Sequence, residues 1–188
     1  MWWARLLNVI SGLLSGGVAA STNSYESIST VTVGAGGVAS ISFSSIPSTY
    51  KHLQFRMMLK GTVASAALLV QYSGDTASNY NNHYLEGSGA SASAGYDATS
   101  AMIIYGSMAP TAATNVFSGG VLDILDYTNT NKYKTSRTLI GNDTNGAGYI
   151  DFDSGLWRST SAISSALFYP TSGNFAQYSQ IALYGIKG

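Results

Sequence analysis

The sequence predicts an all-β fold: an antiparallel, jelly-roll-like β-sandwich that follows a short apolar helix or arm at the N-terminus. Short runs rich in β-branched and aromatic residues recur along the chain, and turn-forming Gly, Asn, Ser and Pro separate them. After residue 20 no stretch has the 3.6-residue periodicity of a helix. We therefore expect an anchoring arm over residues 1–20 and one sandwich domain over residues 21–188, with two packed sheets of about four strands each.

The strongest strand signal is HLQFRMMLK, residues 52–60. Leu53, Phe55, Met57 and Leu59 alternate with mostly polar residues, so one face of this strand is apolar and the other is polar. This pattern is typical of a half-solvated antiparallel sheet, and we expect the four apolar side chains to lie in the core.

A hairpin is expected near the N-terminus, where the runs 25–33 and 38–46 are joined by the glycine-rich segment 34–37. Pro47 would end the second run. Further strands are expected at residues 66–72, 81–86, 101–108, 117–127, 134–141, 148–152, 163–169 and 177–186.

The first 20 residues, MWWARLLNVISGLLSGGVAA, differ from the rest of the chain. The apolar run ends at Gly16-Gly17 and is shorter than the about 20 residues that a transmembrane helix needs. We expect it to bury apolar side chains against a partner subunit; an uncleaved signal sequence and a helix on a membrane surface are the alternatives. The candidate partner-binding residues are Trp2, Trp3, Leu6, Leu7, Ile10 and Leu13.

The composition argues against several classes of partner. Charged residues make up 10% of the chain, and nine basic residues balance nine acidic ones, so no net field attracts a nucleic acid. Near-zero net charge favours association and suits a subunit of a larger assembly. The sequence has no cysteine, which excludes disulfides and thiolate chemistry and fits assembly in a reducing cytosol.

Two acidic motifs are candidate functional sites. Asp143 to Gly148 is similar to the start of a calcium loop, but Ala147 and Ser154 stand where ligands are needed, which favours a glycine-rich hairpin turn. Asp151 and Asp153 would point to one face of a strand, a geometry that could serve glycoside hydrolysis or a cation. We interpret them instead as two solvated carboxylates on a polar face.

The remaining polar residues give no catalytic signature. Asp123 and Asp126 are three apart and do not share a strand face, so one of them should need a hydrogen-bonded partner. His52 and His83 stand alone and do not make a zinc site. Nucleophile-elbow and phosphate-loop motifs are missing, so we expect no enzyme activity, no metal and no cofactor. Thirteen tyrosines suit either an ordinary β-protein or a carbohydrate-contacting surface.

Several stretches resemble one family of proteins: residues 25–34 (YESISTVTVG), 41–54 (ISFSSIPSTYKHLQ), 123–127 (DILDY), and the C-terminal NFAQYS and ALYGIK. They are similar to a group of virion structural proteins of tailed bacteriophages, notably aquatic phages. The resemblance spans about residues 25–188, and its motifs are structural.

The resemblance implies a jelly-roll-like subunit, commonly a homotrimer, that binds the major capsid protein or other virion proteins on the particle exterior after assembly in the host cytoplasm. We favour a capsid decoration (cement) protein, because the chain has no fibrous repeat or heptad from which to build a shaft. A tail-fibre or tail-adaptor subunit and a carbohydrate-binding module are the alternatives. On the favoured reading, the arm inserts into a groove on the capsid or at a trimer seam, and Gly16-Gly17 acts as its hinge.

Overall fold

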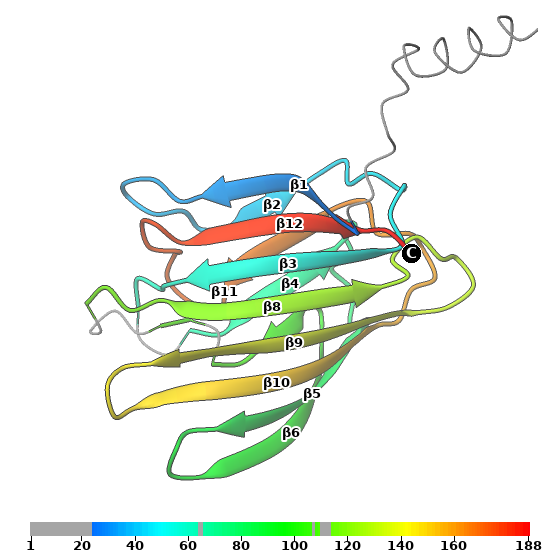
Figure 1. Cartoon of the computed structure of the whole chain (residues 1–188). Helices are drawn as coiled ribbons and strands as arrows, with labels where there is room; N and C mark the ends of the chain where they lie inside the picture. Colours follow the sequence, from blue (N-terminus) through cyan, green and yellow to red (C-terminus); the bar gives the residue numbers. More distant parts are fainter. Residues whose placement is uncertain (1–23, 64–65, 107, 110–113) are drawn as a thin grey trace, which may run out of the picture.

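Two antiparallel β-sheets of unequal size make up the fold (Figure 1). This computed structural model describes residues 24–63, 66–106, 108–109 and 114–188. The larger sheet has eight strands, in the order β1 (Tyr25–Thr32), β12 (Gln180–Ile186), β3 (His52–Leu59), β8 (Ser118–Leu125), β9 (Lys134–Asp143), β10 (Gly148–Trp157), β5 (Tyr80–Gly87) and β6 (Ala92–Thr99). The smaller sheet has four, in the order β2 (Ile41–Phe43), β11 (Ala166–Pro170), β4 (Leu68–Tyr72) and β7 (Met102–Ile104).

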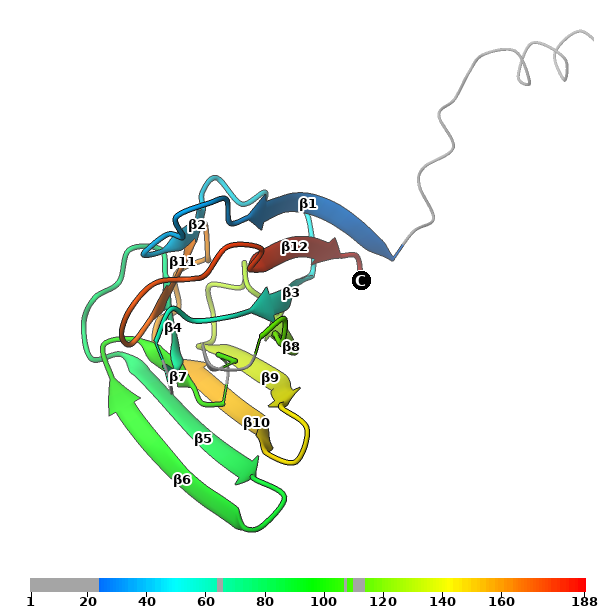
Figure 2. The same cartoon turned by 90° about the vertical axis from the view of Figure 1, so that its left-hand side faces the viewer.

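The chain passes back and forth between the two sheets, as in a jelly roll. Only the β5–β6 hairpin and the β8–β9–β10 meander stay within one sheet along the described chain. Figure 2 shows the larger sheet curving around the smaller one, with β5 and β6 extending past β7. The smaller sheet therefore covers one face of the larger sheet, here called the inner face, and leaves the outer face uncovered by any described strand.

Edge-to-face aromatic contacts join the sheets at the centre of the core. Phe55 of β3 lies 5.4 Å from Phe43 and 4.9 Å from Phe168 between ring centroids, and the latter two belong to the smaller sheet. All three rings are buried. Because such pairs add to the free energy of burying their area, this triad fixes how the two sheets face each other.

A second aromatic cluster joins the sheets at another point. Tyr72, Tyr80 and Trp157 lie with ring centroids 5.8–6.3 Å apart; the Tyr80 and Trp157 rings stack, and the Tyr72 ring is tilted against both. The Trp157 indole N–H donates to Asp75 Oδ2 at 2.7 Å, and the Tyr80 hydroxyl donates to the Asp75 carbonyl at 3.0 Å. The polar groups of Tyr80 and Trp157 thus both bind a single turn residue, Asp75.

Most of the predicted strands are confirmed. Leu53, Phe55, Met57 and Leu59 are all buried in β3, and the polar Arg56 lies on the exposed face. The predicted sheet sizes are wrong, because eight strands rather than about four join the larger sheet. The sequence analysis did not predict β6. Its sequence, ASAGYDAT, is rich in small residues, and both of its faces are largely exposed.

The predicted hairpin of residues 25–33 and 38–46 is also wrong. β1 pairs with β12, and β2 pairs with β11 in the other sheet. Val38 instead forms an antiparallel bridge with Phe175, which draws the chain away from β1. Gly37 has φ +72°, and a Cβ there would meet the Phe175 carbonyl, so glycine is required for this sheet-to-sheet crossing rather than for a hairpin turn.

We predict that Phe55→Ala lowers the free energy of unfolding by about 3–5 kcal/mol, because it opens a cavity between the sheets. Met58→Ala on the same strand is the control, since Met58 is 54% exposed and its loss should cost well under about 1 kcal/mol. Urea unfolding followed by tryptophan fluorescence measures both. Equal losses for the two variants would contradict the core assignment.

Candidate functional site

The predicted partner-binding residues Trp2, Trp3, Leu6, Leu7, Ile10 and Leu13 lie outside the residues that the structure describes. The expected helix or arm therefore stays a prediction. Over the described ranges, no helix has the length and apolar character required to cross a bilayer. The candidate sites that the structure does place are a polar cluster on the inner face of the larger sheet, a salt-bridged turn, and an apolar strip on its outer face.

Asp151 and Asp153 of β10 point to the inner face and are both buried, so the prediction of two solvated carboxylates is wrong. The physical reason for the burial of Asp151 is that the loop at Gly106 packs directly over its carboxylate. Gly106 has φ +57°, and a side chain there would collide with Asp151 Oδ2. Neither carboxylate has a hydrogen-bond partner among the described residues. We call these two residues, with Asp97, the inner acidic cluster.

Burial sets the protonation of this cluster. Burial, together with the charges of Asp151 and Asp97, raises the pKa of Asp153 to about 8. Burial likewise raises the pKa of Asp151 to about 7, with the Glu86 charge adding to the effect. Both groups therefore hold protons up to neutral pH, which removes the cost of two bare buried charges.

A cavity of about 300 Å³ opens beside the inner acidic cluster. Its polar lining comes from Glu86, Tyr105, Asn142, Thr144 and Tyr149, and Met108 with alanine and glycine residues completes the wall. Burial raises the pKa of Tyr105 to about 12, with Asp97 adding to the effect, so its hydroxyl stays a donor at neutral pH. A concave pocket with a few convergent polar groups is a candidate site for a small ligand.

Metal chemistry has no support in the described part of the chain. No three His, Cys, Asp or Glu side chains there come together in a way that could hold a metal ion. The segment similar to a calcium loop is the β9–β10 turn, where Thr144 N–H donates to the Ala147 carbonyl and Asn145 N–H donates to Asp143 Oδ1. The interpretation of this segment as a hairpin turn is confirmed.

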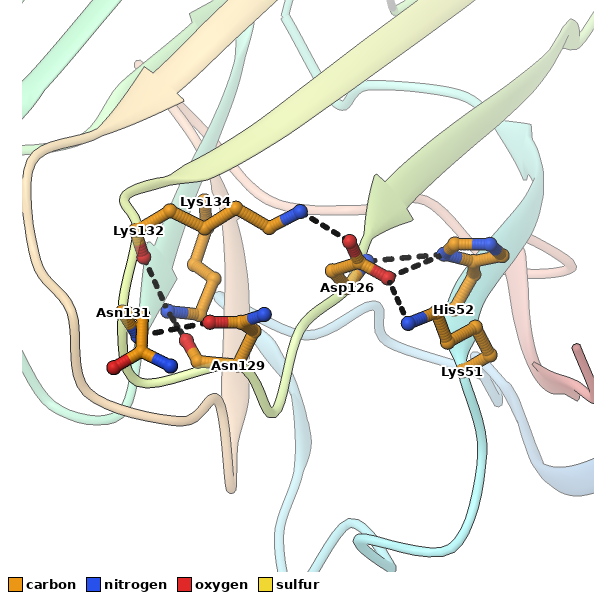
Figure 3. A network of polar contacts seen from close by, with 7 residues as sticks. All are labelled: Lys51, His52, Asp126, Asn129, Asn131, Lys132 and Lys134. Atoms are coloured by element: carbon orange, nitrogen blue, oxygen red, sulfur yellow. Dashed lines mark hydrogen bonds and ion pairs between the residues drawn. The ribbon is translucent and has the colours of Figure 1, made fainter.

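Asp126, at the turn after β8, is the centre of a charged network (Figure 3). Its carboxylate pairs with Lys132 and, at 2.9 Å, with Lys51. Hydrogen bonds and charge from these lysines lower the pKa of Asp126 to about 2. The backbone N–H of Asp126 donates to His52 Nδ1 at 3.0 Å. His52 therefore stabilises this turn. The prediction that one of Asp123 and Asp126 needs a hydrogen-bonded partner is confirmed for Asp126.

Lys134 is a buried cation beside this network. Its ammonium donates to three backbone carbonyls: Asn129 at 2.7 Å, and Lys132 and Thr160 at 3.1 Å each. Burial lowers the pKa of Lys134, but the three carbonyls satisfy its three donors. This lysine ties the β8–β9 turn to the loop before β11, a structural role rather than a chemical one.

The outer face of the larger sheet carries exposed apolar side chains in one contiguous strip. Leu85, Phe152, Leu139 and Val121 are cross-strand neighbours on β5, β10, β9 and β8. Ile150 lies two residues from Phe152 on the same strand face. About half of each of the larger side chains is exposed, 59% for Ile150. We call these five residues the outer apolar strip. The sequence analysis did not identify them as a candidate site.

A hollow of about 470 Å³ runs along this strip. Gly119 and Gly141 form part of its floor, because on this face they present no side chain, and Val121, Leu139 and Ile150 form its walls. A second hollow of about 320 Å³ shares Val121 and continues to Met58, and its lining also includes Arg56, Gln180 and Tyr184. We call the combined feature the outer furrow.

Comparisons with known proteins add little to this geometry. No family model matches the sequence, and no curated protein matches it. Among solved structures, the galectin LEC-6 of Caenorhabditis elegans is similar, with a TM-score of 0.34 and 11% identity; the alignment covers 86% of this chain and 99% of the galectin. A TM-score of this size carries no argument about fold or ligand.

We predict that the inner acidic cluster makes stability fall as pH rises. Asp151 and Asp153 have raised pKa values in the folded state, so their contribution is fully present below about pH 4 and is lost between about pH 4 and pH 8. Asp126 acts in the opposite sense, because its lowered pKa contributes stability that is lost as pH falls towards 2.

Asp153→Asn should therefore raise the melting temperature at pH 8.5 and leave it nearly unchanged at pH 4. Between these values, the variant should release about one proton fewer on unfolding than the natural chain. Differential scanning calorimetry across this range measures both effects, with Asp143→Asn in the exposed β9–β10 turn as the control. An unchanged pH slope in Asp153→Asn would contradict the assigned protonation.

Proposed function

We propose that this chain is a non-enzymatic structural subunit of a phage virion, a capsid decoration (cement) protein that docks through the outer apolar strip. The observation that carries the proposal is the strip itself. Several large apolar side chains lie side by side on one exposed sheet face, where monomeric proteins seldom leave such a patch uncovered.

The chemistry of the strip favours a protein surface as its partner. Burying apolar area contributes about 25 cal/mol per Å², and salt does not screen this term as it screens ion pairs. The strip contains no charged side chain, and the chain as a whole has no net charge. Docking by apolar contact therefore suits a subunit that must hold neighbouring capsomers together where salt would screen ion pairs.

The bacteriophage setting comes from the resemblance of residues 25–188 to virion structural proteins. The partners proposed on that basis are the major capsid protein or other virion proteins, with three copies of this chain in one decoration unit on the particle exterior. A tail-fibre or tail-adaptor subunit is the nearest alternative, since it too would dock by an apolar face.

A carbohydrate-binding function is the second candidate, favoured by the cavity beside the inner acidic cluster. Tyr105 and Tyr149 would offer rings to a sugar, and Glu86 and Asn142 would accept or donate its hydrogen bonds. A glycan array probed with the purified full chain tests this candidate. Binding that disappears in Tyr149→Ala would support it.

We predict that the double variant Ile150→Glu and Phe152→Glu folds normally but is absent from virions. Both side chains point to solvent in the isolated chain, so new carboxylates there cost little until a partner surface must desolvate them. Quantitative mass spectrometry of virions assembled with the variant measures its incorporation. Tyr133→Glu, in the exposed turn between β8 and β9, is the control.

Copy number in the same virions separates the candidates. A copy number in simple proportion to the major capsid protein supports decoration, and a small fixed number supports the tail. Normal incorporation of the double glutamate variant would overturn the docking role of the outer apolar strip, whereas absence of the natural chain from virions would overturn the bacteriophage setting.

A further inference from the structure

We infer that Asn145 is a site of spontaneous deamidation in the folded chain, a reaction that converts this asparagine into aspartate and isoaspartate. The site lies in the turn that joins β9 to β10, residues 144–147. The inference is independent of the proposed docking role of the outer face, because it concerns the covalent chemistry of one exposed turn.

Asn145 is the one asparagine of the sequence that is followed by a glycine. Deamidation begins when the backbone nitrogen of the next residue attacks the asparagine side chain, and a side chain on that next residue obstructs the approach. Gly146 has no side chain, and even an ideal Cβ built on it would meet no atom within 4 Å. Its backbone nitrogen is therefore the least hindered nucleophile that follows any asparagine in the sequence.

The turn itself favours this pair of residues. Asn145 has φ +63° and Gly146 has φ +106°. Two consecutive positive φ values are characteristic of the two-residue hairpin turn in which Asn-Gly is preferred. The Thr144 N–H donates to the Ala147 carbonyl at 2.7 Å and closes the loop. The geometry of the hairpin thus retains the residue pair that is most susceptible to deamidation.

The reacting groups of this pair are accessible. Asn145 and Gly146 are both exposed. The backbone N–H of Asn145 donates to Asp143 Oδ1 at 2.7 Å. In the part of the chain that the structure describes, the Asn145 side-chain amide and the Gly146 N–H have no hydrogen-bond partner. Water and hydroxide can therefore reach both groups.

The reaction consumes one water molecule and releases one ammonia. Hydroxide removes the proton from the Gly146 nitrogen, which forms a bond to Asn145 Cγ; the Cγ–Nδ2 bond then breaks, and Nδ2 takes up a proton and leaves as ammonia. Water opens the resulting cyclic imide at one of its two carbonyl groups, which gives either aspartate or isoaspartate. Both products add one negative charge, and isoaspartate also lengthens the loop by one backbone atom.

The longer loop of isoaspartate alters the wall of the cavity beside the inner acidic cluster, because Thr144, Ala147 and Gly148 line that cavity. It should also weaken the bond between Thr144 and Ala147. We expect the Thr144 amide to exchange its hydrogen faster in the aged chain than in Asn145→Asp, which has the new charge but a loop of normal length. Equal exchange rates would contradict this effect on the turn.

Incubation of the purified full chain in warm, mildly alkaline buffer tests the inference. We expect isoelectric focusing to show a band with one additional negative charge that grows with time, and peptide mass spectrometry to place aspartate and isoaspartate at position 145. Asn131 is the internal control, because it is exposed in the β8–β9 turn but precedes Lys132. It should stay intact over the same period.

Two variants identify the source of the new charge. Asn145→Gly removes the reactive amide and keeps the turn, since glycine readily adopts positive φ, so the acidic band should disappear. Asn131→Gly is the matched control and should leave the rate unchanged. An acidic band that persists in Asn145→Gly would overturn the inference. Modification of Asn145 that occurs only in urea would also overturn it, because the folded turn would then protect the pair.

Discussion

The unequal size of the two sheets is the constraint on which the rest of this structure depends. Four strands cover eight, and the aromatic triad of Phe43, Phe55 and Phe168 fixes the smaller sheet over the centre of the larger one. Every surface discussed above follows from that placement. The covered part of the inner face is apolar, its margin beneath β7 and the loop at Gly106 is polar, and the outer face is covered by no described strand.

The polar margin explains why carboxylates are tolerated inside this protein. Met102 of β7 packs so closely on β10 that Gly155 has no space for a side chain, and Gly106 closes over Asp151. The carboxyl groups enclosed in this way keep their protons rather than pair with a cation. The charged groups that do pair, Asp126 with Lys51 and Lys132, lie at the edge where water is available.

Sequence reasoning predicted the fold class and the best strand but not the sites. Alternation along residues 52–60 identified the core positions of β3, because one of its faces is buried and the other is not. The same reasoning placed Asp151 and Asp153 in solvent, since alternation tells which residues share a face but not which face is covered. The glycine-rich segment 34–37 likewise indicated a turn without indicating which strands it joins.

The outer apolar strip was missed for a related reason. Its members come from four strands that are distant in sequence, so they form a patch only when the register of β5, β10, β9 and β8 is known. Gly119 and Gly141 gave no signal of their own, because a glycine in a strand is usually a weak point rather than the floor of a furrow. The pattern of a single sequence contains little information about which distant strands pair with one another.

We propose that the outer face of the larger sheet is buried in an assembly, and because the sequence has no cysteine, introduced thiols can test this burial directly. Leu139→Cys places a single thiol on the outer apolar strip, and Tyr133→Cys places one in a nearby exposed turn. The rate of maleimide labelling is then compared in purified particles and in the dissociated chain. We expect assembly to protect the thiol at position 139 and to leave the thiol at position 133 reactive. Equal labelling of both thiols in intact particles would contradict it.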